Sequence, residues 1–182
     1  MCIESSDEEV GLSGMADHYL VEIEAVEVAA VAIERAVQAR SLCGEQGESP
    51  TIRDFAYRAI EQYEGISEDV RAYADMILED TRVVENLVLE WLYGTLEITV
   101  IFRESSANEK VSEPELSGIE LLLSYGGPTS LLTFDPSKNG RCDLAVYSGS
   151  NVAIRPAFCP HVLDVVKNFE ENDLFVTHFL HQ

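Results

Sequence analysis

Histidine and cysteine are the residues in this sequence best suited to acid–base, nucleophilic or metal chemistry. The histidines are His18, His161, His178 and His181. Cys159 and His161 flank a proline, so a Cys/His zinc site completed by Cys142 can be drawn. The spacing matches no standard pattern of zinc ligands, and the four cysteines lie far apart. We therefore expect no metal site, no cofactor and no disulfide framework, which is typical of a reduced cytoplasmic protein.

Other catalytic motifs are incomplete. Gly149-Ser150-Asn151 lacks the second glycine of a nucleophile elbow, and Gly126-Gly127-Pro128 lacks the lysine of a phosphate-binding loop. Both segments are typical of turns. No spacing of Asp and Glu matches a calcium loop, and carboxylates are too frequent for spacing to identify a catalytic pair. The sequence therefore favours a protein that is not an enzyme.

The charge of the chain is its most unusual property. It has 33 Asp and Glu against 12 Lys and Arg, a net charge of −21. Residues 1–94 hold 21 of the acids and 6 arginines, so this half carries −15. Such a surface repels nucleic acid and anionic membranes, and it attracts basic protein surfaces. The longest apolar run, 28–33, is far shorter than the roughly 20 residues of a membrane span.

The N-terminal half must position most of these acids on helices. Residues 1–16 are expected to form an acidic flexible tail. Over 17–42, an apolar stripe recurs every three or four residues and predicts a helix, although the alternation at 21–24 is strand-like. Glu24, Glu27 and Glu34 fall on another face of this helix. They are the first half of a candidate partner-binding surface.

Two further helices are predicted by their capping residues. Thr51 with Asp54 predicts a capping box, and Ser67 predicts the start of a helix that continues to Gly94, with a break near Asp80-Thr81. Asp75, Glu79 and Asp80 lie close together on this last helix. They are the second half of the candidate surface, with an ordinary solvated acidic face as the alternative.

Beyond residue 94 the apolar period changes from helical to twofold. The predicted strands are 96–103, 119–125, 130–134, 142–147 and 152–158. Short turns between them predict an antiparallel meander, Pro160 begins a closing helix, and 174–180 is left open between strand and short helix. The fold class is α+β: N-terminal helices, an antiparallel sheet of about five strands and a C-terminal helix. We expect one domain, 17–182, with a helical part (17–94) and a β-rich part (95–182).

Two segments resemble motifs of small phage and plasmid proteins. Residues 52–60, IRDFAYRAI, resemble an R-D-x-A-x-x-A-I helix, and residues 120–128, ELLLSYGGP, resemble an E-x-x-L-x-x-G-G-P strand and turn. The chain is thus similar to acidic antirestriction and anti-CRISPR types of anti-defence protein. Residues 62–65 depart from the aromatic patch expected after the first motif. The resemblance implies inhibition of a host DNA-binding defence enzyme, and it transfers no functional residue.

These observations lead to one functional hypothesis and two alternatives. The hypothesis is a non-enzymatic inhibitor whose acidic surface mimics nucleic acid and occupies the basic groove of a defence nuclease or effector. Its expected contact residues are Glu24, Glu27, Glu34, Asp75, Glu79 and Asp80. The alternatives are a small cytosolic hydrolase and a general interaction module with an apolar patch near Trp91 and Tyr93. The sequence leaves open the partner and the oligomeric state, a dimer included.

Overall fold

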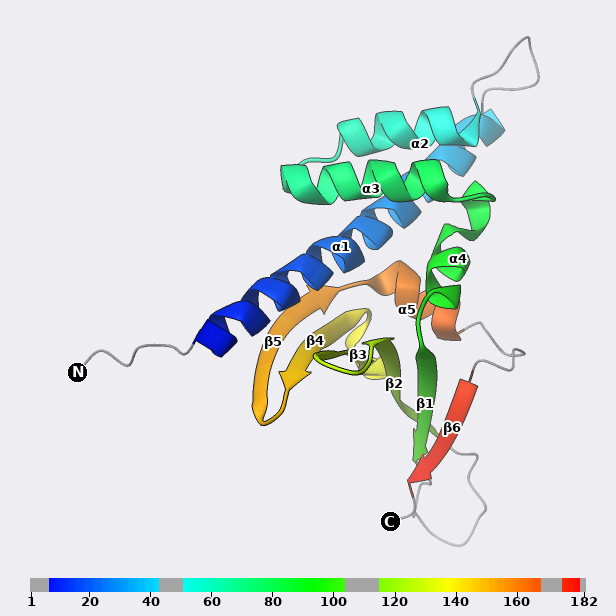
Figure 1. Ribbon diagram of the computed structural model, residues 1–182. Coiled ribbons are helices and arrows are strands. Elements are labelled where there is room, and N and C mark those ends of the chain that lie inside the picture. Colours follow the sequence, from blue (N-terminus) through cyan, green and yellow to red (C-terminus); the bar gives the residue numbers. More distant parts are fainter. Residues whose placement is uncertain (1–6, 43–50, 104–114, 168–174, 181–182) are drawn as a thin grey trace, which may run out of the picture. The chain divides into compact units, whose positions relative to one another are not determined.

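A computed structural model describes the backbone of residues 7–42, 51–103, 115–167 and 175–180 (Figure 1). Side chains are described for 11–42, 51–102 and 116–167. The chain forms two compact units rather than one: a helical unit, Leu20–Tyr93, and a sheet unit, Met1–Tyr19 with Gly94–Gln182. The helix α1 (Asp7–Leu42) contributes residues to both units. The junction at residues 93 and 94 lies where the sequence pattern changes period.

The remaining helices of the helical unit are α2 (Ile52–Glu61), α3 (Glu68–Asp80), the 3-10 turn η1 (Val84–Asn86) and α4 (Leu87–Tyr93). Of these, α2 and α3 begin at the predicted caps, α3 ends at the predicted break, and the last helix ends before Gly94. Thr51 Oγ1 accepts a hydrogen bond from Asp54 N at 3.2 Å, and Asp54 Oδ2 accepts one from Thr51 N at 2.8 Å. Ser67 Oγ accepts one from Val70 N. The capping box, the Ser67 cap and the break after Asp80 are therefore confirmed.

Two details of the helices differ from the sequence expectations. The first helix begins at Asp7, so residues 7–16 are not a tail: Leu12 is 4% exposed and Ala16 is fully buried. Burial of these apolar residues offsets the helix cost of Gly11 and Gly14, about 1 kcal/mol each. In α3 the buried residues are Val70, Ala74 and Leu78. The near-helical spacing of Val70, Tyr73 and Ile77 predicts that all three face the core, but Tyr73 and Ile77 are only half-buried.

The sheet unit confirms the predicted α+β fold with five antiparallel strands. Its elements are β1 (Glu97–Arg103), β2 (Glu115–Ser124), β3 (Thr129–Phe134), the 3-10 turn η2 (Pro136–Lys138), β4 (Arg141–Ser148), β5 (Asn151–Phe158), the helix α5 (Pro160–Lys167) and β6 (Phe175–Leu180). The strand order is β5-β4-β3-β2-β1-β6. Strands β1 to β5 form the antiparallel meander, and β6 pairs in parallel with β1. The segment left open at 174–180 is thus a strand.

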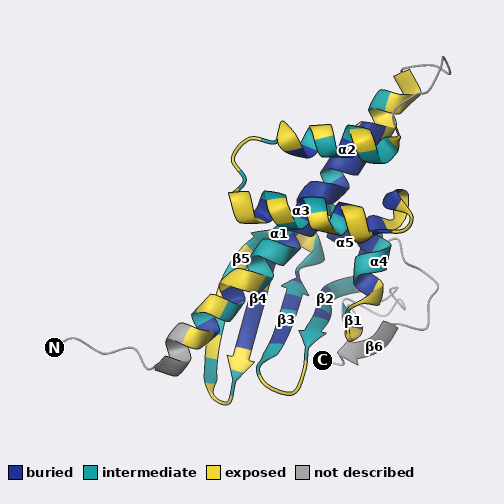
Figure 2. Cartoon of the chain, turned by 45° about the horizontal axis from the view of Figure 1, so that its top comes forward, coloured by how far each residue is buried: buried dark blue, intermediate teal, exposed yellow. Residues whose placement is uncertain are grey.

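Side chains of the sheet alternate between a buried face and an exposed one (Figure 2). Leu132, Phe134 and Leu144 lie on the buried face and are at most 1% exposed. On β5, the guanidinium of Arg155 bonds to Asp17 Oδ1 at 2.6 Å and to Ser13 Oγ, both on α1. The first turns of α1 are therefore fastened to the edge of the sheet. Of the helices that the structure describes, none has both the length and the apolar content that crossing a bilayer requires.

A buried hydroxyl on β3 gives a stability prediction. Ser130 Oγ is fully buried and has no hydrogen-bond partner among the described residues, whereas Ser124 Oγ donates to Pro128 O at 3.1 Å. An unpaired buried hydroxyl is unfavourable, so we expect Ser130→Ala to raise the free energy of unfolding by about 1 kcal/mol. The matched variant Ser124→Ala should lower it by a similar amount. Urea denaturation measures both, and a destabilised Ser130→Ala protein would contradict the assignment.

Candidate partner-binding surface

Two helices of the helical unit bring charged residues from distant positions together. Helices α2 and α3 lie side by side and run antiparallel (Figure 1). Charged and tyrosine side chains recur every fourth residue on each: Arg53, Tyr57 and Glu61 on α2, and Arg71, Asp75 and Glu79 on α3. A four-residue spacing places each trio on one helix face. These six residues define the α2–α3 seam.

The arginines of the seam donate hydrogen bonds to main-chain carbonyls at helix ends. Arg53 Nη2 donates to Thr81 O at 2.6 Å, just beyond the last residue of α3. Arg71 Nη1 donates to Ile60 O at 2.6 Å, and its Nη2 donates to Tyr63 O at 3.1 Å, at the end of α2. The last carbonyls of a helix lack partners within the helix and carry its negative dipole end, so these bonds stabilise both termini. Each of the two helices thus has an arginine in its first turn, and that arginine donates to carbonyls at the C-terminal end of the other helix.

Burial and neighbouring charges act on the acidic groups of the seam. Neither Asp75 nor Glu79 forms an ion pair within the described part of the chain, whereas Lys138 pairs with Asp135 and Arg155 pairs with Asp17. Burial raises the pKa of Asp75, Arg71 partly opposes the shift, and Glu61 adds to it. Burial also raises the pKa of Tyr57, with further contributions from the charges of Glu79 and Asp75. The middle of the seam is therefore a partly desolvated negative site beside one hydroxyl donor.

Of the predicted acids on α3, Asp75 and Glu79 belong to the α2–α3 seam and Asp80 follows it in the sequence, whereas those on α1 do not form one exposed face. Asp75 is half-buried, and Glu79 and Asp80 are exposed. Glu34 is exposed and accepts a bond from Gln38 Nε2 at 3.1 Å. Burial raises the pKa of Glu24.

Glu27 corrects the expectation of an acidic face on α1. It is only 8% exposed, so it is not part of an accessible surface. Its neighbours Ala25, Val26, Val28 and Ala29 are buried as well, and this stretch is enclosed around most of its circumference. A one-sided stripe was the wrong description because a run of small apolar residues lets neighbouring elements approach from several directions.

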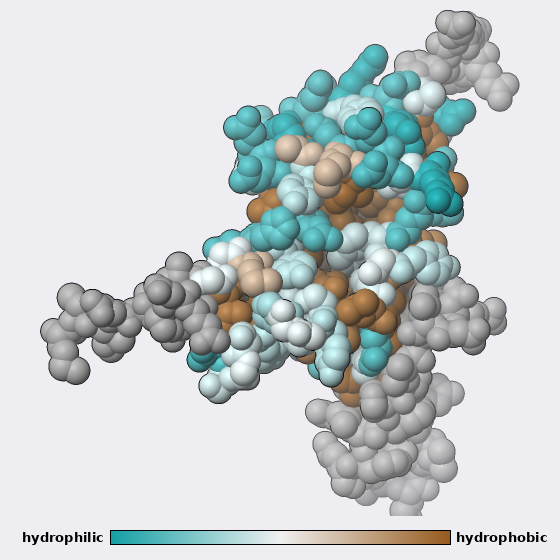
Figure 3. Space-filling model, viewed as in Figure 1, coloured by the Kyte–Doolittle hydropathy of each residue, from teal (hydrophilic) through white to brown (hydrophobic). Residues whose placement is uncertain are grey.

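Sequence reasoning missed Tyr57 and Glu61, although a signal was present. The patterns R-x3-Y-x3-E, at residues 53–61, and R-x3-D-x3-E, at residues 71–79, have the same form. An antiparallel return after a short connection places the start of each pattern beside the end of the other. Figure 3 shows that hydrophilic side chains cover most of the visible surface over α2 and α3.

The two alternative functions, a small hydrolase and an interaction module with an aromatic patch, have less structural support than the acidic surface. In the described ranges, no group of three or more His, Cys, Asp or Glu is arranged to hold a metal ion. Cys142 and Cys159 are 5% and 0% exposed, so neither thiol is presented to a substrate. Trp91 Nε1 donates to Glu22 Oε1 at 3.3 Å, and Tyr93 is 58% exposed. The expected aromatic patch is therefore reduced to one exposed tyrosine.

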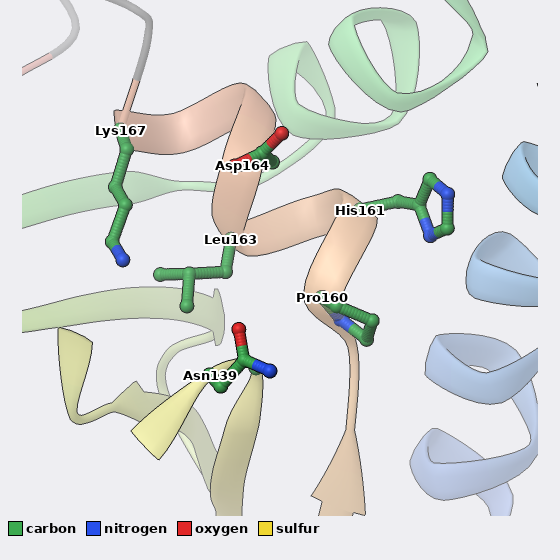
Figure 4. A pocket seen from close by; sticks show the side chains of 7 residues that line it. Asn139, Pro160, His161, Leu163, Asp164 and Lys167 are labelled. Carbon is green, nitrogen blue, oxygen red and sulfur yellow. The ribbon is translucent and has the colours of Figure 1, made fainter. Parts of the chain in front are cut away.

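A pocket of about 250 Å³ lies in the sheet unit, between the β3–β4 connection and α5. Its lining includes Asn139, His161, Asp164 and Lys167. Figure 4 shows that His161 points away from Asn139 and Lys167. Lys167 Nζ donates to Pro136 O at 3.0 Å. Asn139, His161 and Lys167 therefore do not point toward one another in this pocket.

Comparison with models of known protein families, with curated proteins and with solved structures finds no match for this chain. The functional proposal below therefore depends on the geometry and charge of the chain itself.

The pKa values of Asp75 and Asp54 are shifted in opposite directions, so substitutions at these two sites should have opposite effects on stability at neutral pH. The raised pKa of Asp75 means that its charged form disfavours folding, so Asp75→Asn should raise the denaturation midpoint at pH 7. Solvent screening limits the gain to less than about 1 kcal/mol. The gain should disappear as the pH falls below the raised pKa of Asp75.

Asp54 is the matched comparison because its pKa is lowered by the Thr51 hydroxyl and the Thr51 N–H. Its charged form favours folding, so this stabilisation is present above the usual Asp pKa and is lost as the pH falls through the lowered value. Asp54→Asn should therefore destabilise the protein at pH 7 and have little effect in acid. Thermal melts of both variants from pH 3 to pH 7 measure whether each substitution stabilises or destabilises the protein. If both substitutions shift the melting temperature in the same direction at pH 7, the assigned pKa shifts are contradicted.

Proposed function

We propose that this protein is a non-enzymatic binding protein whose α2–α3 seam, together with Asp80, occupies a basic groove on a partner protein. One observation carries the proposal: among the described residues Asp75 and Glu79 form no ion pair, because Arg53 and Arg71 direct their guanidinium groups to main-chain carbonyls. A partly desolvated acid such as Asp75 costs stability, which is expected of a site that serves binding rather than folding. The arginines or lysines of a partner would supply the missing counter-charges.

The kind of partner follows from the spacing of the charges. Asp75 and Glu79 are one helical turn apart, about 6 Å along the axis. Alternate phosphates of one DNA strand are about 6.8 Å apart along the duplex axis. A groove that binds nucleic acid presents cations at a comparable spacing. The proposed partner is therefore the nucleic-acid groove of a nuclease or effector, and host defence enzymes, as in antirestriction and anti-CRISPR inhibition, are the leading class.

The test measures binding and competition together. The protein is immobilised, basic nucleases from a host extract are captured at about 50 mM and at about 300 mM salt, and duplex DNA is added as a competitor. We expect capture to weaken at least about tenfold at the higher salt and to be displaced by DNA. The captured nuclease should also cleave DNA more slowly when the protein is present. Capture that ignores both salt and DNA would overturn the proposal.

A further inference from the structure

The sheet unit has a second exposed surface, on the opposite side of the sheet from its core. Strand register places Ile154, Ala145, Leu131 and Leu122 in one row across β5, β4, β3 and β2. Val152 and Tyr147 form the adjacent row, and Phe158 lies on the same side of β5. Ile154 and Phe158 are 55% and 56% exposed, Leu131 and Leu122 are half-buried, and the small side chain of Ala145 is buried between them. We call these seven residues the open face.

Carboxylates border the open face on one side. Glu97 pairs with Leu122 and ends the apolar row, while Glu120 and Asp143 flank Thr133 in the next row. Arg141, opposite Phe158, is a cation on this side of the sheet. The apolar row thus has an acidic margin. A partner that covers it must supply both apolar and positively charged side chains.

The neighbouring sheet edge is protected against strand addition. Arg155 Nη1 donates to Ile154 O at 3.1 Å, which satisfies a main-chain acceptor of β5. Pro156 has no N–H to offer to another strand. Edge protection of this kind disfavours β-augmentation. The open face is therefore accessible to a partner that lies on it rather than to one that extends the sheet.

We propose that the open face binds an amphipathic helix of another protein, with apolar residues on one side and lysine or arginine along one flank. The row from Ile154 to Leu122 spans three strand spacings, about 14 Å, which matches roughly ten residues of helix. Leucine-like anchors at helical spacing would contact Ile154, Leu131 and Leu122, and the basic flank would face Glu120 and Asp143. A second copy of this chain fits less well because both copies would bring the same acidic margin.

The test uses the full chain and a labelled synthetic peptide of leucine and lysine, with the leucines at amphipathic helical spacing. Fluorescence anisotropy gives the dissociation constant. We expect Ile154→Asp to weaken binding at least about tenfold. The matched control is Val37→Asp, which adds the same charge at an exposed apolar residue of α1 and should leave binding unchanged. Added negative charge alone would attract the peptide, so a loss confined to Ile154→Asp identifies an apolar contact.

Charge variants on the margin complete the test. We expect Asp143→Asn to weaken peptide binding severalfold and Arg141→Gln to strengthen peptide binding. Equal effects of Ile154→Asp and Val37→Asp would overturn the proposal. If only the double variant Asp75→Lys with Glu79→Lys loses binding, the peptide binds the α2–α3 seam, and the proposal is overturned. A sedimentation experiment in which Ile154→Asp converts a dimer to a monomer would overturn it in favour of a second copy. The outcome of the nuclease capture experiment does not depend on these peptide results, so either proposal can be contradicted without the other.

Discussion

The double variant Asp75→Lys with Glu79→Lys should bind a basic partner at least about a hundredfold more weakly than the native chain. Each substitution removes an attraction and places a like charge opposite the partner's cations. Asp75 is also half-buried, so its interactions are less screened than those of a fully exposed acid. Biolayer interferometry with the captured nuclease, at low and high salt, measures the loss. The difference between native and variant protein should shrink as salt rises.

The control for this experiment carries the same change of net charge outside the seam. Glu64→Lys with Glu85→Lys reverses two exposed acids of the helical unit, and we expect only a small loss of affinity. Glu34→Lys tests separately whether exposed acid on α1 participates. If the control pair weakens binding as strongly as the seam pair, net charge rather than the seam carries recognition. Circular dichroism verifies that each variant retains its helices.

Substitutions in the two cores should have the largest effects on stability. Leu144 on β4 and Leu78 on α3 are fully buried, and we expect each Leu→Ala change to lower the free energy of unfolding by about 2–5 kcal/mol. The loss combines the transfer of buried methyl groups with the cavity left behind. Because each leucine belongs to a different compact unit, hydrogen exchange should accelerate mainly in β3, β4 and β5 for Leu144→Ala, and mainly in α2 and α3 for Leu78→Ala.

Leu96→Ala is the matched control for the core variants. Leu96 is 60% exposed, so its truncation should change stability by no more than about 0.5 kcal/mol. Native-state hydrogen exchange read by mass spectrometry resolves the two units within the intact chain. Equal acceleration throughout both units for either core variant would show that they unfold as one cooperative body, contrary to the expectation.

Features that depend on a few neighbouring residues were predictable from the sequence. The capping box of Thr51 and Asp54 uses side chains three residues apart, so its hydrogen bonds form wherever the helix starts. Most strand boundaries followed from twofold alternation and from turns, which are also local, but β2 begins at Glu115, four residues before the predicted start at 119. The acids on α3 could be predicted as near neighbours for the same reason. Such patterns state which residues share an element, and they do not state what packs against it.

Packing decided the rest. The start of α1 at Asp7 depends on burial of Leu12 and Ala16, which no local pattern signals beside Gly11 and Gly14. Enclosure of Glu27 depends on how neighbouring elements surround α1. The seam exists only because α3 returns antiparallel to α2, which sets Tyr57 and Glu61 beside Asp75 and Glu79 and sends both arginines to helix ends. The sequence by itself determined the amount of negative charge and the helices that carry it, because composition and periodicity are properties of the chain. Only the tertiary structure decided which of the described carboxylates lack an ion-pair partner, because that depends on where the few cations form their hydrogen bonds.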